Sequence, residues 1–234
     1  MTHLAFATPS FIISASLAWN KGTPEAFLKA QLPALLDAHV FGTCGFNLDG
    51  SRADGCEASP GKALLDLGLA ESYLENKRSH ALVNKTSADS ILLRILLNTD
   101  EVALDGLAVD DFGIVLQKLK KAQSGLLKAS SYTQSPREQS LNQELFLTSE
   151  LLILSSRIGR SLMANGQNGS EKNVINVGVA NLPPTFRTDI ANKALTLVEQ
   201  YRALWLSRYE PQGMQASLLN LSNMLSKFIP EEQK

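Results

Sequence analysis

Adjacent acidic residues are the first candidates for acid/base chemistry in this sequence. Asp100 and Glu101 are neighbours, and paired carboxyl groups are what many acid/base enzymes use to move protons. The pair follows a predicted helix end, and no pattern around it indicates the pocket needed to shift a carboxyl pKa. We therefore interpret it as part of a solvated loop. Asp110 and Asp111 precede a predicted helix, where acids favour the helix N-terminus.

Histidine and cysteine offer no metal site or nucleophile in the sequence. His3, His39 and His80 lie far apart, each without a carboxylate or cysteine at ligand spacing. Cys44 and Cys56 flank a polar loop, and they pair if the chain is secreted and stay thiols if it is cytosolic. No phosphate-binding, dinucleotide-binding or nucleophile-elbow motif occurs. We expect no catalytic residue, no metal and no cofactor.

The composition excludes several classes of protein. The 234 residues carry 22 basic and 23 acidic side chains, for a net charge of −1, and 44% are hydrophobic. This content supports a packed core, and the charge balance and 6% aromatic content argue against a nucleic-acid partner. The apolar stretch Leu4 to Trp19 is interrupted at Thr8-Pro9-Ser10, so we predict no membrane span and no membrane partner. The compartment, cytoplasmic or secreted, stays open.

The N-terminal apolar stretch has two interpretations. Phe11 to Trp19, followed by the turn residues Asn20-Lys21-Gly22, has the composition of a buried β-strand. Alternatively, Ser16-Leu17-Ala18 is a small-residue cleavage site at the end of a signal peptide, although only His3 supplies a cationic start. We favour the strand.

The rest of the chain has the apolar spacing of helices. Predicted helices begin near Thr23, Ser59, Ser87, Asp110, Ser135, Phe186 and Met214. Short turns between them favour antiparallel neighbours. The predicted fold class is therefore mainly α: an antiparallel helical bundle of six to seven helices, preceded by one short β-strand. Residues 1–22 form the strand segment and residues 23–234 the helical domain.

The fifth and sixth predicted helices carry the most specific patterns. Ser135 and Glu138 have the spacing of a capping box, in which each side chain pairs a backbone N–H of the first helical turn. The fifth helix also has a face of small residues that admits a close neighbour: Thr148, Ser155, Ser156 and Gly159. Trp205 lies beside the apolar stripe of the sixth helix, which predicts a buried ring whose removal costs about 3–5 kcal/mol.

Several segments together resemble one enzyme family. They are YRALWLSRYEPQGM at residues 201–214 with Ser217 and Leu218, SLAWN at 16–20, LLDAHVF at 35–41, ALLDLG at 63–68, and residues 144–163. The first is similar to the ending of some proteins of glycoside hydrolase family 20, the β-N-acetylhexosaminidases. The others resemble the last barrel strand, the first helices after the barrel and a later helix of the same proteins.

The resemblance implies the C-terminal helical region of such an enzyme, from the last barrel strand onward. The family carries its catalytic acids in a His-x-Gly-x-Asp-Glu context on the fourth strand of a (β/α)8 barrel, and this sequence has no such motif. Asp100-Glu101 lacks the His and Gly and follows the last-strand segment, so the catalytic role does not transfer. Whether the chain belongs to an enzyme stays open, but we expect it to be inactive alone.

The resemblance also implies one substrate-binding position. Trp19, with Asn20 beside it, corresponds to the end of the eighth strand, where the side chain forms part of the wall around an amino sugar in the complete enzyme. Trp19 serving only in packing is the alternative. A second function from another class is also open: a free-standing helical interaction or scaffold module without enzymatic activity.

Overall fold

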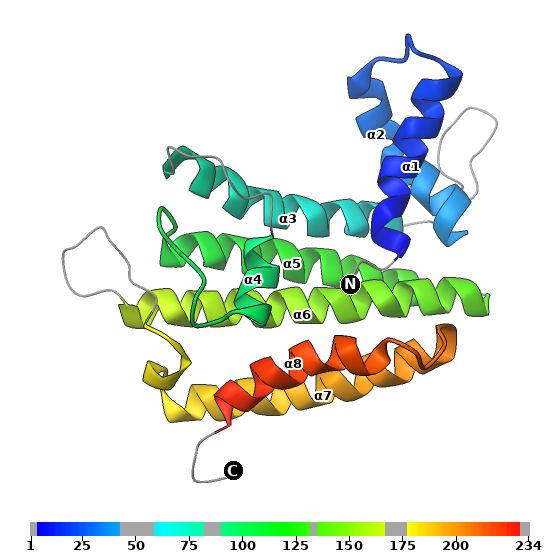
Figure 1. Cartoon of the computed structure of the whole chain (residues 1–234). Coiled ribbons are helices and arrows are strands. Elements are labelled where there is room, and N and C mark those ends of the chain that lie inside the picture. The colour runs from blue at the N-terminus through cyan, green and yellow to red at the C-terminus, as the bar shows by residue number, and fades with distance from the viewer. Residues whose placement is uncertain (1–3, 43–58, 82–89, 132–134, 167–176, 230–234) are drawn as a thin grey trace. The chain divides into compact units, whose positions relative to one another are not determined.

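The chain is mainly helical, which confirms the mainly α part of the predicted fold class (Figure 1). The described residues form eight α-helices, one or two more than predicted. The structure, a computed structural model, describes residues 4–42, 59–81, 90–131, 135–166 and 177–229. These ranges contain the α-helices α1 Leu4–Trp19, α2 Glu25–Leu36, α3 Pro60–Ala81, α4 Ile91–Leu97, α5 Val109–Ser130, α6 Pro136–Gly166, α7 Pro184–Arg208 and α8 Met214–Phe228. They also contain a π-helix, η1 Asp37–Phe41, and a 3-10 helix, η2 Val179–Asn181.

The predicted N-terminal strand is wrong. Phe11 to Trp19 lies in α1, and the described ranges contain no strand. A lone strand leaves its backbone N–H and C=O groups unpaired, whereas a helix pairs them within the segment. The hydroxyl of Ser16 also donates to the carbonyl of Ile12 at 2.8 Å. A helix therefore satisfies this backbone where no second strand lies beside it.

The helices divide between two compact units. Unit 1 comprises Met1–Gly68 and Lys121–Ser149, and unit 2 comprises Leu69–Lys120 and Glu150–Lys234. The boundaries fall within α3, α5 and α6, so each of these helices contributes to both units. The predicted separation of a segment 1–22 from a helical domain 23–234 stays a prediction.

In unit 1, α1 and α2 form an antiparallel hairpin (Figure 1). Leu28, Leu32 and Leu36 of α2 are buried, as their spacing predicts. The helix continues through Pro33, although a proline inside a helix removes one backbone hydrogen bond. It then widens into η1, the form of helix with one extra residue per hydrogen-bonded ring.

Buried Asp37 connects the start of η1 to the start of α3. Its carboxylate accepts hydrogen bonds from the hydroxyl of Ser59 at 2.6 Å and from the backbone N–H of Gly61 at 2.7 Å. The Ser59 hydroxyl accepts in turn from the N–H of Lys62 at 2.9 Å, which confirms the predicted helix start. Gly61 is required here, because a Cβ atom would lie 2.7 Å from the Cβ of Leu36.

The parts of α5 and α6 in unit 1 are joined by polar contacts near the turn between them. The predicted capping box is confirmed: the N–H of Ser135 donates to Glu138 Oε2, and the N–H of Glu138 donates to Ser135 Oγ, both at 3.2 Å. Buried Asn142 donates from Nδ2 to the carbonyl of Leu126 at 3.2 Å. These bonds fix the beginning of α6 against the end of α5.

In unit 2, the small-residue face of α6 packs closely against α4 and α5. The Ser155 hydroxyl donates to the carbonyl of Leu92, and the Ser156 hydroxyl donates to the carbonyl of Phe112 at 3.1 Å. A Cβ atom on Gly159 would lie 2.8 Å from Ile95 Cδ1. Both serines are fully buried. The prediction that this face admits a close neighbour is therefore confirmed.

The last two helices, α7 and α8, form a second antiparallel hairpin, also within unit 2 (Figure 1). The predicted stripe of α7 is buried from Ile190 to Leu204, and Leu225 and Phe228 are buried on α8. Gly213, which has a φ of 81°, begins α8 in the left-handed region that glycine adopts most easily. The hairpin thus ends in the corner that carries the sequence motif of residues 201–214.

Candidate functional site

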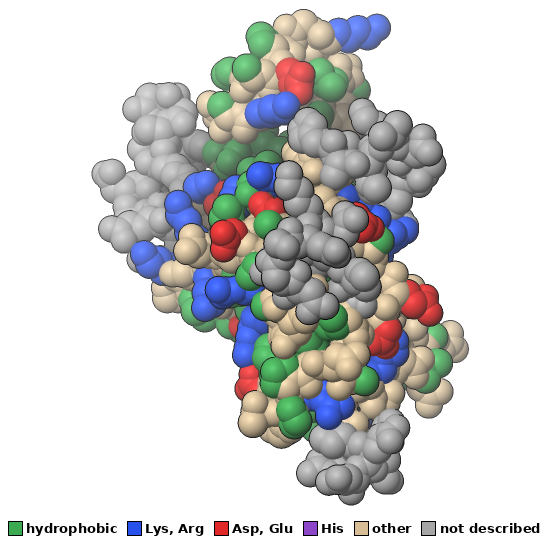
Figure 2. All heavy atoms as spheres, turned by 90° about the vertical axis from the view of Figure 1, so that its left-hand side faces the viewer, with side chains coloured by type: hydrophobic (Ala, Val, Ile, Leu, Met, Phe, Trp, Pro, Cys, Tyr) green, Lys and Arg blue, Asp and Glu red, His purple; other side chains and the backbone are tan. Residues whose placement is uncertain are grey.

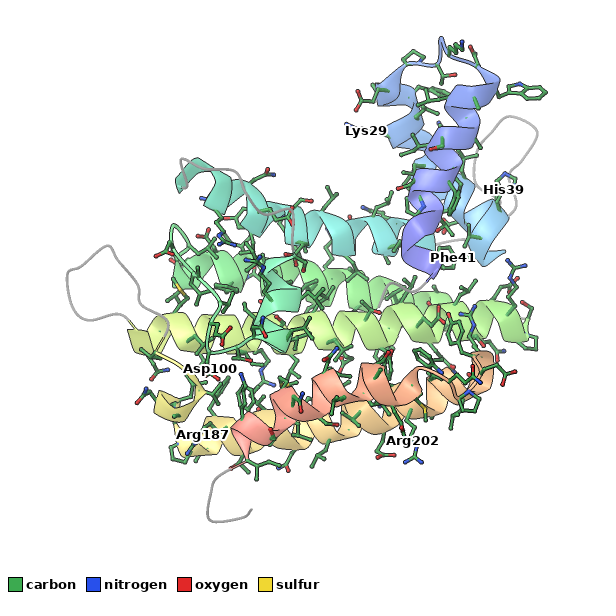
Figure 3. All side chains as sticks on the ribbon, in the orientation of Figure 1. Lys29, His39, Phe41, Asp100, Arg187 and Arg202 are labelled. Carbon is green, nitrogen blue, oxygen red and sulfur yellow. The ribbon has the colours of Figure 1, made fainter. Side chains whose placement is uncertain are left out.

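Asp100, the first member of the acidic pair, fastens three segments of unit 2 together. It lies in the segment between α4 and α5 (Figure 3). Its Oδ1 accepts a hydrogen bond from the N–H of Val179 in η2 at 2.8 Å. Its Oδ2 lies 3.0 Å from the ammonium of Lys227 on α8. Gly178, with a φ of 75°, lets the backbone approach this carboxylate.

These contacts keep Asp100 ionised. Partial burial acts to raise the pKa of Asp100, but the hydrogen bond from Val179 and the charge of Lys227 outweigh it, so the pKa lies below its ordinary value. A general acid needs the opposite shift, because it must hold a proton at the working pH. Glu101 is exposed. The structure therefore assigns Asp100 a structural contact, and the pair does not form an acid/base site.

Trp19 and Asn20 lie at the C-terminal end of α1. The Trp19 side chain is 93% exposed, so it packs into no core. Asn20 Oδ1 accepts a hydrogen bond from the N–H of Gly22 at 3.0 Å, which holds the turn into α2. The alternative of Trp19 as a packing residue does not fit this exposure. The resemblance sets Trp19 at the end of a strand, whereas here it ends the helix α1. Its role as a sugar contact stays a prediction.

The exposed face around Trp19 extends along α1. Phe11 is 66% exposed and Leu17 is 40% exposed, and none of the 16 residues of α1 is charged. On α2, Phe27 is 57% exposed. Figure 2 shows that hydrophobic side chains reach the surface of the molecule among the charged ones. A helix that is apolar on all sides is usually buried. The lack of charge between Leu4 and Asn20 was the signal for this surface in the sequence.

Glu71 on α3 holds the start of α4. Its Oε1 accepts hydrogen bonds from the N–H of Ile91 at 2.6 Å and of Leu92 at 3.3 Å. Burial raises the pKa of Glu71, and the two backbone bonds and Ser90 only partly offset this effect. No local pattern predicts this contact, because Glu71 and Ile91 are 20 residues apart and no motif links them. The partners of Glu71 all lie at the N-terminal end of α4, so we assign this carboxyl group a structural role.

A polar cluster joins α3 and α5 in unit 2. The hydroxyl of Tyr73 donates to Asp111 Oδ1 at 2.9 Å, and the N–H of Ala108 donates to Asp111 Oδ2 at the same distance. The ammonium groups of Lys77 and Lys118 lie 5.7 Å and 5.3 Å from the centre of the Tyr73 ring. The ammonium of Lys77 also lies 3.8 Å from Asp111 Oδ1. The expectation that Asp111 supports a helix start is consistent with its bond to Ala108.

Aromatic residues of the sequence motif meet at the corner between α7 and α8. The Trp205 ring lies 5.9 Å from Tyr201 and 5.3 Å from Tyr209, centre to centre, and its Nε1 donates to the carbonyl of Glu210 at 2.7 Å. Arg208 lies over the Tyr209 ring at 5.6 Å. Trp205 is only partly buried, so the expectation of a fully buried ring is wrong. The Trp205 ring lies against the turn between α7 and α8, to which it is hydrogen-bonded at Glu210, and this position leaves part of the ring at the surface.

Of the remaining histidine and cysteine candidates, His39 alone has a side chain that the structure describes. His39 is exposed on η1 (Figure 3), and Cys44, Cys56 and His3 lie outside the described residues, as does the side chain of His80. Among the residues that the structure describes, no three His, Cys, Asp or Glu side chains form a group that could hold a metal ion. In the same part of the chain, no helix is long and apolar enough to cross a bilayer.

The candidate functional surface is the exposed, uncharged face of α1 together with Phe27 of α2. Comparison with known proteins adds no relative to this description. No protein-family model, no curated protein and no solved structure matches the chain.

Proposed function

We propose that the chain is the C-terminal helical part of a glycoside hydrolase of the family 20, β-N-acetylhexosaminidase type, and that it does not hydrolyse glycosides alone. The observation that carries this proposal is the charge-free helix α1, on which Phe11 and Trp19 are largely exposed. Such a helix requires another protein surface over it. In the proposed enzyme, the catalytic barrel provides that surface.

The corner between α7 and α8 also supports the proposal. The segment at 201–214 that resembles the family ending forms the corner between α7 and α8, where Trp205 Nε1 donates a hydrogen bond to the carbonyl of Glu210. The aromatic and arginine residues of this segment contact one another, which fits a structural rather than a catalytic role. Catalysis would then depend on acids outside this chain, since Asp100 is held ionised by Val179 and Lys227.

Within this proposal, Trp19 and Asn20 contribute to an amino-sugar site only in the complete enzyme. Trp19 offers an exposed aromatic ring, and aromatic rings are suited to pack against the apolar face of a bound ligand. Asn20 holds the turn that follows.

A chromogenic N-acetylglucosaminide tests the proposed lack of activity. The purified chain is incubated with the substrate beside an active β-N-acetylhexosaminidase. We expect release of the chromophore by the reference enzyme and no release above the blank by this chain. Robust turnover that co-purifies with the chain would contradict the proposal.

A second candidate function is a free-standing helical interaction or scaffold module without enzymatic activity. The same exposed surface of α1 favours it, because an interaction module also presents an apolar face to a partner. The two proposals predict different nucleotide sequences upstream of the segment that encodes this chain. A reading frame that continues upstream into a barrel favours the first, and a promoter with an upstream stop codon favours the second.

A further inference from the structure

The exposed face of α1 is uncharged and mixes large with small side chains. Phe11, Ser14, Ala15 and Ala18 are all exposed and follow the helical spacing i, i+3, i+4 and i+7, so they lie on one face. Leu17, 40% exposed, lies next to this face. The face is therefore a helix-packing surface with one bulky residue, Phe11, and three small ones.

From this face we infer that the chain, when it stands alone, forms a two-fold symmetric dimer in which α1 packs antiparallel against α1 of a second copy. The inference rests on the proposed function in one respect: it takes α1 as a surface that another protein covers. In a complete enzyme, the same face would be occupied and the dimer would not form.

The absence of charged residues on α1 is compatible with a second copy of the chain as the partner. A two-fold axis brings each surface against its own equivalent, so any charge near the axis meets a like charge and repels it. α1 has no charged residue from Leu4 to Trp19. A pair of these helices therefore meets without repulsion.

The order of large and small residues along the exposed face of α1 is also compatible with an antiparallel pair of these helices. With the axis between Ser14 and Ala15, an antiparallel arrangement sets Phe11 of one helix opposite Ala18 of the other. A large side chain then faces a small one at both ends, and Ser14 faces Ala15 at the centre. Side chains of complementary size let two helices interdigitate.

The size of the face predicts a weak dimer. A helix of 16 residues is about 24 Å long and about 10 Å wide. One face of it provides less area than the roughly 800 Å² per partner of a stable interface. We therefore expect the dimer to dissociate on dilution.

Sedimentation equilibrium of the whole chain over a wide range of concentrations tests the dimer, in reducing buffer so that Cys44 and Cys56 cannot cross-link copies. We expect the average mass to rise with concentration from 25.4 kDa toward twice that value. Phe11→Glu places like charges at the interface and should keep the mass at the monomer value. Ala15→Arg, at an exposed position near the axis, should also keep the mass at the monomer value. This variant replaces Phe11→Glu in the test if Phe11→Glu fails to fold.

Leu206→Glu is the matched control. Leu206 is 49% exposed on α7, outside the proposed interface, so this variant should associate as the unchanged chain does. A chain that stays monomeric at every concentration would overturn the inference. Equal loss of association in Leu206→Glu and Phe11→Glu would overturn it too, because it would indicate nonspecific association. The glycosidase assay is read separately, so either result leaves the test of the proposed function intact.

Discussion

At the scale of single residues, carboxyl groups in this protein hold backbone N–H groups rather than substrates. Asp37, Glu71 and Asp100 each accept at least one backbone hydrogen bond from a segment distant in sequence. For Asp100, whose pKa is lowered, the bond is charge-assisted, and such bonds are stronger than neutral ones. These hydrogen bonds connect helix ends and loops that are distant in sequence. The acids thus explain local order, and they leave no acid/base pair among the described residues.

Replacement of Asp100 by Asn should lower stability at neutral pH. The pKa of Asp100 is lowered in the folded chain, so its contribution is present above the unfolded pKa and is lost as pH falls through the folded pKa. Because the ion pair with Lys227 is partly exposed, we expect a loss of about 1 kcal/mol or less. Urea unfolding at several pH values measures it. Glu101→Gln is the control, and an equal loss in both variants would contradict the assigned contact.

Replacement of Glu71 by Ala should show the opposite pH dependence. The loss of an acceptor for two N–H groups at the start of α4 costs about 1–2 kcal/mol. Burial raises the pKa of Glu71, so its stabilising contribution is complete below the unfolded pKa and declines as pH rises through the folded pKa. The cost of Glu71→Ala should therefore be larger at acidic than at alkaline pH. Glu71→Gln keeps the acceptor without titrating, and a cost of Glu71→Ala that does not vary with pH would refute this account.

At the scale of elements, the helix starts and the helix faces were the parts that the sequence predicted well. Ser135 and Glu138 pair each other's backbone N–H because this signal is contained within four residues. The burial of Ser155, Ser156 and Gly159 followed from spacing along one helix. The conformation of Phe11 to Trp19 could not be predicted in this way. An apolar run without a clear period is compatible with either a strand or a helix, and the neighbouring segments decide between them.

Replacement of Gly159 by Ala tests the close packing of α6. The added Cβ would lie 2.8 Å from Phe112 Cζ and from Ile95 Cδ1, both in buried side chains. Overpacking of this kind costs about 1–3 kcal/mol. Gly113→Ala on α5 is the matched control, since its Cβ would have no neighbour within 4 Å and should stabilise the helix by up to about 1 kcal/mol. Thermal unfolding compares the two, and a lower melting temperature for Gly113→Ala than for Gly159→Ala would contradict the packing.

At the scale of the whole molecule, the fold class could be predicted and the division into units could not. The periodic apolar residues from Leu28 to Phe228 predict helices, because burial on one face repeats every 3.6 residues. Unit boundaries at Gly68, Lys120 and Ser149 fall inside continuous helices, where composition does not change. The exposure of Trp19 alone does not decide whether it contacts a sugar.

The most direct test of the central claim is the nucleotide sequence upstream of the codon for Met1. If the chain is the C-terminal part of a family 20-like enzyme, the reading frame continues upstream without a stop codon. It then encodes barrel strands and a His-x-Gly-x-Asp-Glu motif. An in-frame stop codon directly upstream, preceded by a promoter and with no such motif encoded nearby, would contradict the claim.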